Sequence, residues 1–134
     1  MPLLLDEDYV RLQTQGLQWE EVPERRFLIL IGFPLPEGLY TVPKADVLVI
    51  IEGRYPEAGH DMLWTAPRLV RTDGVTIPAI ENSGSQNNHK VGDTEYHRWS
   101  RHWDDTPGRW VPGKSNADTI VQRIVWALAK PLLI

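Results

Sequence analysis

The chain has 134 residues and a formal net charge of −4, a length that fits one domain over residues 1–134. Its 42% hydrophobic and 24% charged residues indicate a soluble globular protein, and the absence of cysteine excludes disulfides, thiolate metal sites and thiol nucleophiles. The sequence has no basic stripe of the kind that binds nucleic acids, and no apolar run approaches the roughly 18 residues of a membrane span. The first residues do not have the pattern of a signal peptide, so we expect a cytoplasmic protein.

The first half of the chain predicts one helix followed by strands. Residues 6–16 begin with three acidic residues and close on a glycine, which is typical of a short helix. Residues 19–22 predict a first strand. Residues 27–31 and 47–51 are continuous apolar runs that predict two buried strands, the first of them ended by Gly32.

The second half predicts one more strand, a long loop and a helix. Residues 62–70 predict a strand, and an Asp-Gly turn predicts that residues 75–77 fold back as a small hairpin. Residues 82–93 are rich in Ser, Gly, Asn and Gln and predict a long irregular loop, a common place for function. Helical spacing of apolar residues then predicts a terminal helix that starts near Ser115 and ends before Pro131.

This order of elements predicts an α+β fold. It consists of an N-terminal helix, an antiparallel meander of three to four strands, a long loop that we expect to serve the active site, and a C-terminal helix. Strands that follow one another without intervening helices favour antiparallel pairing, with the helices gathered on one side.

Several motifs resemble the ubiquitin-conjugating enzymes (the UBC/RWD superfamily) between residues 35 and 128. They are Leu35-Pro36-Glu37-Gly38, Tyr55-Pro56 followed by Asp61-Met62, Trp99-Ser100-Arg101-His102, and Trp110-Val111-Pro112-Gly113. The set is most similar to a stand-alone prokaryotic branch, here without the catalytic cysteine. The resemblance implies a bacterial pathway with an activating enzyme, a ubiquitin-like protein and a JAB-type peptidase as partners, and no membrane or nucleic acid.

In that family the nucleophilic cysteine lies shortly before the Trp-x-Pro motif, which points here to residues 98–103. Two side chains of this segment have the chemistry to replace a thiol: Ser100 as an oxyester, or His102 as a base or an acyl-imidazole. His97 is a further candidate base, and Arg101 or Arg98 is a candidate for meeting an oxyanion. In an extended segment Ser100 and His102 share one face.

Two other interpretations stay open. The first is a non-catalytic module of the same superfamily that docks the activating enzyme or the ubiquitin-like protein. A His-dependent metal hydrolase is the weaker alternative, because the four histidines lack the close spacing of a helical zinc site, and we expect neither a metal nor another cofactor. Asp104 and Asp105 predict a solvated turn, and the basic residues near the tryptophans (Arg98, Arg101, Arg109) suit a carboxylate, a phosphate or a partner protein.

Overall fold

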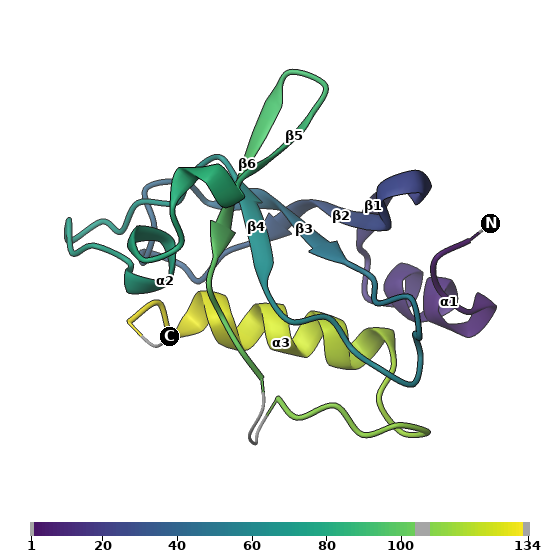
Figure 1. Ribbon diagram of the computed structural model, residues 1–134. Helices are drawn as coiled ribbons and strands as arrows, with labels where there is room; N and C mark the ends of the chain where they lie inside the picture. Colours follow the sequence, from purple (N-terminus) through teal and green to yellow (C-terminus); the bar gives the residue numbers. More distant parts are fainter. Residues whose placement is uncertain (1, 104–107, 133–134) are drawn as a thin grey trace.

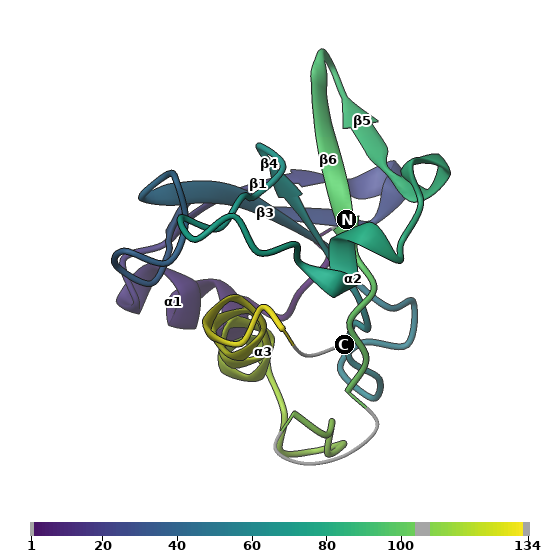
Figure 2. The same ribbon diagram turned by 90° about the vertical axis from the view of Figure 1, so that its left-hand side faces the viewer.

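A six-stranded antiparallel sheet carries the fold, with two helices packed on one of its faces (Figures 1 and 2). The computed structural model describes residues 2–103 and 108–132. The elements in chain order are α1 Asp6–Thr14, β1 Gln18–Val22, η1 Pro23–Arg25, β2 Phe27–Pro34, β3 Lys44–Ile50, β4 Leu63–Ala66, α2 Pro78–Glu81, η2 Ser85–Asn87, β5 His89–Val91, β6 Thr94–Trp99 and α3 Ala117–Ala129. None of the helices in this part of the chain is long and apolar enough to cross a membrane.

The first four strands form the predicted meander, since β1 to β4 pair antiparallel in sequence order. One expectation about β2 was wrong, because the strand does not stop at Gly32. The pairing of β2 with β3 shifts register between Leu30 and Phe33 and then continues to Pro34. Gly32 has φ +61°, and its amide donates to Asp46 Oδ1 at 2.8 Å, so a side chain of β3 bonds the backbone at this irregularity.

The second half of the sheet differs from the prediction of three to four strands. Strand β6 pairs with β4, and β5 forms the outer edge, so the strand order is β1-β2-β3-β4-β6-β5. The predicted loop at residues 82–93 contains η2 and β5 and leads into a hairpin. The Asp73-Gly74 turn does form, but residues 75–77 are not a strand.

Two hydrophobic clusters lie on opposite faces of the sheet because neighbouring strand residues point to opposite sides. The main core includes Leu28 and Leu30 of β2 and is covered by α3 through its fully buried residues Ile120, Ile124 and Leu128. Each of these helix side chains contributes about 1.5–3 kcal/mol when buried. The second cluster consists of Phe27, Ile29, Leu48, Trp64 and Tyr96.

Helix α3 begins at a side-chain cap next to the predicted position. Asn116 is the N-cap: its Oδ1 accepts from the amide of Asp118 at 2.8 Å, and its own amide donates to Thr119 Oγ1 at 3.1 Å. Ser115 instead accepts from the amide of Val111 at 2.9 Å. The capping residue was therefore misplaced by one position, while the helix itself was predicted correctly.

A buried carboxylate ties α1 to the loop after β3 and to the start of α3. Asp8 is 1% exposed. Its Oδ2 accepts from the Tyr55 hydroxyl at 2.7 Å and from the Leu5 amide at 3.2 Å, and its Oδ1 accepts from the Ala117 amide at 3.1 Å. Burial, together with this hydrogen bond, raises the pKa of Tyr55. We call Asp8, Tyr55 and the Ala117 amide the Asp8 cluster.

Candidate functional site

The two motifs at the centre of the family resemblance are in direct contact. Trp110 donates its indole N–H to the carbonyl of Pro56 at 2.8 Å, and its ring lies 5.7 Å from that of Tyr55. A Cβ added at Gly59 would lie 2.2 Å from the Trp110 ring, so only glycine fits there. Residues far apart in the sequence thus form one wall of the candidate site.

The segment from Trp99 to Trp103 follows the end of β6 and alternates in burial. Trp99, Arg101 and Trp103 are buried, Ser100 is half-buried and His102 is exposed. This is the alternation expected of an extended segment, and it directs the His102 side chain toward solvent.

His102 forms a pair with Asp61, the acidic residue that opens the segment before β4. His102 Nδ1 lies 2.9 Å from Asp61 Oδ2, and both side chains are about half exposed, at 50% and 56%. A carboxylate beside Nδ1 holds the proton of a neutral imidazole there, which leaves the lone pair on Nε2. In this tautomer Nε2 of His102 is the ring atom with an available lone pair.

Ser100 and His97 do not join this pair. Within residues 2–103 and 108–132, no hydrogen bond links the Ser100 hydroxyl to a histidine, and the Ser100 amide donates to the Ala79 carbonyl at 2.9 Å. His97 lies on β6 opposite Thr65, with its Nδ1 3.2 Å from Asn88 Nδ2, so this candidate base lies apart from the His102–Asp61 pair.

The two arginines that were candidates for stabilising an oxyanion, Arg98 and Arg101, have different surroundings. Arg98 donates from Nε to the Ser83 hydroxyl at 2.6 Å, so part of its guanidinium is already used. Arg101 is 8% exposed and lies over the Trp103 ring at 4.6 Å. Burial lowers the pKa of Arg101.

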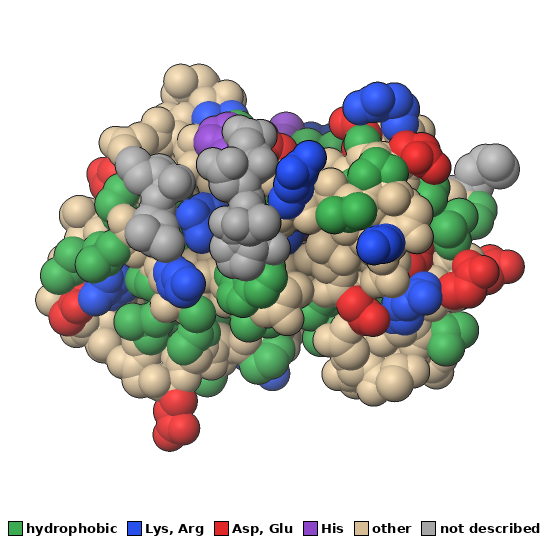
Figure 3. Space-filling view, turned by 90° about the horizontal axis from the view of Figure 1, so that it is seen from below, with side chains coloured by type: hydrophobic (Ala, Val, Ile, Leu, Met, Phe, Trp, Pro, Cys, Tyr) green, Lys and Arg blue, Asp and Glu red, His purple; other side chains and the backbone are tan. Residues whose placement is uncertain are grey.

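A hollow opens beside the His102–Asp61 pair, and we call it the arginine hollow. It is lined by Gly59, His60, Asp61, Trp103, Arg109, Trp110 and Arg123. Seen from below, histidine side chains and Lys or Arg side chains lie close together on this face of the molecule (Figure 3). Residues 108–116 lie at the bottom of Figure 1 and the β5–β6 hairpin at the top, so the loop expected to serve the active site leads away from this hollow.

Arg123 holds the loops of this site together from α3. It is 3% exposed, donates to the carbonyls of Gly108 (2.7 Å) and His60, and lies 5.6 Å from the Trp103 ring. Sequence reasoning missed Arg123, although a charged residue directly before Ile124 on the apolar face of the predicted helix was an available signal. Asp61 carried a weaker signal, since it belongs to a resemblance motif but lies 41 residues from its partner.

Buried polar atoms without partners gather at this site. In the described part of the chain, the buried side-chain nitrogens and oxygens that lack a hydrogen bond are both ring nitrogens of His60, Nε of Arg101 and Nε1 of Trp103. Burial lowers the pKa of His60 to about 3, and the nearby Arg123 adds to this effect, so the imidazole is neutral near pH 7.

The residues that the structure describes do not contain a group of three or more His, Cys, Asp or Glu side chains placed to hold a metal ion. The metal-hydrolase interpretation therefore gains no support from them. The predicted turn at Asp104 and Asp105 lies outside the described residues.

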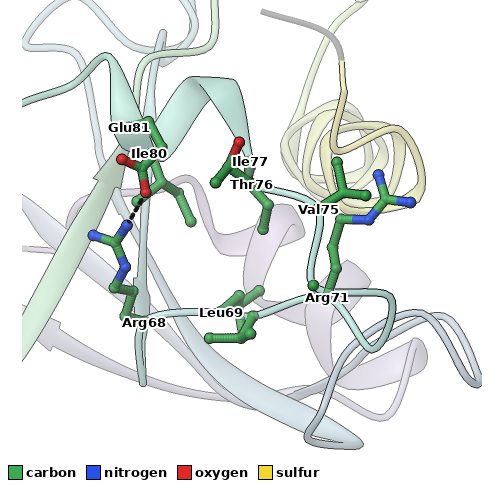
Figure 4. A pocket seen from close by; sticks show the side chains of 10 residues that line it. Arg68, Leu69, Arg71, Val75, Thr76, Ile77, Ile80 and Glu81 are labelled. Carbon is green, nitrogen blue, oxygen red and sulfur yellow. Dashed lines mark hydrogen bonds and ion pairs between the residues drawn. The ribbon is translucent and has the colours of Figure 1, made fainter.

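A second hollow lies between α2 and the segment after β4, and Figure 4 shows it from close by. Its labelled residues include Leu69, Val75 and Ile77, with an ion pair between Arg68 and Glu81 at one end. It contains no histidine and no residue of the resemblance motifs. The arginine hollow is thus the better candidate site.

The α+β fold and the contact between the resemblance motifs fit a cysteine-free relative of the ubiquitin-conjugating enzymes. The sequence matches the family described as Prokaryotic E2 family E over residues 4–131, and the chain belongs to that family. This confirms the predicted relationship to a prokaryotic conjugating-enzyme-like branch. Searches of curated proteins and of solved structures found no significant match.

Proposed function

We propose that the protein carries or transfers a ubiquitin-like protein in a bacterial conjugation pathway, with His102 as the acyl-accepting group. Membership of an E2-like family supports a role in such a pathway, with an activating enzyme and a ubiquitin-like protein as partners. A JAB-type peptidase is a further partner that the resemblance implies. The observation that carries the proposal is the 2.9 Å contact between His102 Nδ1 and Asp61 Oδ2 beside the arginine hollow.

The transfer would take place in two balanced steps. The Nε2 lone pair of His102 attacks the acyl carbon of the thioester held by the activating enzyme, and the C–S bond breaks with release of the thiolate. The amine of the acceptor then attacks the acyl-imidazolium, the C–N bond to His102 breaks, and the Nε2 released by this cleavage takes the proton that the amine gives up, before the imidazolium returns it to water. The Asp61 carboxylate stabilises the positive charge that develops on the ring in both steps.

Ser100 is the alternative acyl acceptor, and the contacts favour His102 over it. A serine hydroxyl needs a neighbouring base to become a nucleophile, and within residues 2–103 and 108–132 no hydrogen bond joins Ser100 to a histidine. His102 needs only the orientation that Asp61 provides. We therefore assign Ser100 no part in the proposed transfer.

The test measures discharge of the ubiquitin-like protein from the activating enzyme's thioester to hydroxylamine, with and without this protein. His102→Gln is expected to lower the added rate at least about 100-fold, the usual size of a lost nucleophile or base. Asp61→Asn should lower it about tenfold or more, because the ring loses its orienting carboxylate. Ser100→Ala and His97→Gln are matched controls that should retain the rate. Full activity of His102→Gln would exclude the proposed role of His102.

Docking without transfer is the second candidate function. The observation that favours it is the exposed apolar surface of the N-terminal region, where Leu5 is 46% and Val10 is 61% exposed beside the exposed Asp6 and Glu7. This candidate predicts that Val10→Asp abolishes binding to the activating enzyme or the ubiquitin-like protein. It also predicts that His102→Gln leaves pathway activity intact.

A further inference from the structure

The unpartnered buried atoms near His102 indicate a binding site that acyl transfer does not require. His60 and Trp103 line the arginine hollow, and the Arg101 guanidinium stacks on Trp103 at 4.6 Å. Among the described residues, these three contain all the buried side-chain polar atoms without a hydrogen bond. Each buried polar atom without a hydrogen bond lowers the stability of the fold by about 1–3 kcal/mol. Their grouping around one hollow therefore indicates that a ligand supplies the missing hydrogen bonds.

Three of the four unpartnered atoms are donors, so the missing group must mainly accept hydrogen bonds. Arginine and the indole of tryptophan only donate hydrogen bonds, and a neutral imidazole donates from one nitrogen. Arg109 adds an exposed guanidinium at the rim, and it makes no hydrogen bond or ion pair with the residues that the structure describes. Unused donors together with an exposed cation define a site for an anion.

The charges around the hollow favour a carboxylate over a phosphate. Arg123 already donates to two carbonyls, which leaves Arg109 as the exposed guanidinium at the rim. The Asp61 carboxylate also lines the hollow and repels a dianion more strongly than a monoanion. One guanidinium matches one carboxylate, which accepts two parallel hydrogen bonds from it.

The walls of the hollow favour a carboxylate at the end of a chain over a small free acid. Trp110 is half-buried and lines the hollow together with the exposed part of Trp103, which is 7% exposed, and indole rings pack well against the apolar part of a peptide. We infer that the arginine hollow binds the free C-terminal carboxylate of a peptide, with Arg109 as the anchor and the Trp103 indole N–H as a second donor. This goes beyond acyl transfer, which uses an activated acyl group, and it does not depend on the proposed role of His102.

The experiment follows the indole N–H signals of the ¹⁵N-labelled full-length protein by NMR. The six tryptophans give six such signals, and Trp103→Phe and Trp110→Phe variants identify two of them. The protein is titrated with N-acetyl-Ala-Ala-Gly that carries a free carboxylate, and separately with the same peptide as its C-terminal amide. Sodium acetate and inorganic phosphate are titrated as the small anions.

The expected result is a saturable shift of the Trp103 signal with the free peptide and none with the amide. Acetate should compete, but at a concentration at least about tenfold higher, because it lacks the apolar contacts. Arg109→Gln should weaken peptide binding about tenfold or more, whereas Arg25→Gln, which removes the same charge at the β1–β2 connection, should not change it.

Equal shifts with peptide and amide, or unchanged binding by Arg109→Gln, would overturn the inference. Tighter binding of phosphate than of peptide would also overturn it, since the site would then suit a dianion. The titration contains no activating enzyme and no ATP. Its failure therefore leaves the proposed function untouched, and loss of transfer by His102→Gln leaves the carboxylate site untouched.

Discussion

The Asp8 cluster and the arginine hollow both bury polar groups, but they do so in opposite ways. At Asp8, 1% exposed, both carboxylate oxygens accept hydrogen bonds from groups of other segments. At the arginine hollow, His60 and Trp103 are buried with polar atoms that have no partner, and so is Arg101, whose guanidinium lies over the Trp103 ring. A satisfied polar cluster stabilises the fold, whereas an unsatisfied one lowers stability and leaves bonding capacity for a ligand. If this difference separates structural residues from functional ones, substitutions in the Asp8 cluster should lower stability more than substitutions at the arginine hollow.

The largest expected effect comes from Asp8→Ala. The substitution leaves the Tyr55 hydroxyl and the Ala117 amide without their acceptor in a buried position. We expect the free energy of unfolding in urea to fall by about 3 kcal/mol. Asp6→Ala on the exposed face of the same helix is the control, with an expected loss below about 1 kcal/mol. Similar losses for both variants would show that Asp8 acts only through its charge on the helix.

Gly59→Ala tests the wall of the hollow. A Cβ at this position would lie 2.2 Å from the Trp110 ring, so the ring must shift away from Pro56. The expected loss of stability is about 1–3 kcal/mol, as for overpacking elsewhere. Gly53→Ala in the same loop meets no atom within 4 Å and should change stability by less than about 0.5 kcal/mol. Tryptophan fluorescence reports on the shift of the Trp110 ring. A spectrum of Gly59→Ala identical to that of the wild type would contradict the contact between Gly59 and Trp110.

The acid sensitivity of folding should reflect the unpartnered His60. Its pKa in the folded protein is about 3, below the value near 6.5 of an unfolded chain. The unfolded chain therefore binds one more proton between these values, and stability falls as the pH drops from 6.5 toward 3. The slope is at most about 1.4 kcal/mol per pH unit. Urea titrations between pH 7 and pH 4.5 should show a shallower slope in His60→Leu than in the wild type.

The smallest effect is expected for His60→Leu at pH 7. Replacing a buried imidazole without hydrogen bonds by an apolar side chain removes two unsatisfied atoms and keeps the backbone carbonyl that binds Arg123. Stability should therefore change by less than about 1 kcal/mol, in clear contrast to Asp8→Ala. A loss of 3 kcal/mol or more would mean that His60 has a partner in solution.

Hydrophobic runs were sufficient to predict much of the fold. The meander of β1 to β4 and the helix α3 follow from periods of two and 3.6 residues. Strand β6 was missed because Thr94–Trp99 contains four polar residues in six, and only Tyr96 and Trp99 are buried. β5 has three residues and offers too little pattern to be detected.

Residues of the candidate site could be predicted only where a nearby sequence motif marks them. His102 could be found because it lies shortly before the Trp-x-Pro motif. Its pairing with Asp61 joins residues 41 positions apart, and the pairing of β4 with β6, which sets Leu63 opposite Trp99, brings their two segments close together. Asp8 looked like one of three acidic residues at a helix start, and no local signal separated it from its exposed neighbours Asp6 and Glu7.

The contact between Trp110 and the loop after Tyr55-Pro56 has a consequence for the history of this chain. The indole ring occupies the space that a side chain at position 59 would need, so each residue limits what the other can become. A relative with alanine or serine at position 59 should carry a smaller residue than tryptophan at position 110. The two positions are then expected to change together, and such paired changes would record the contact in sequences alone.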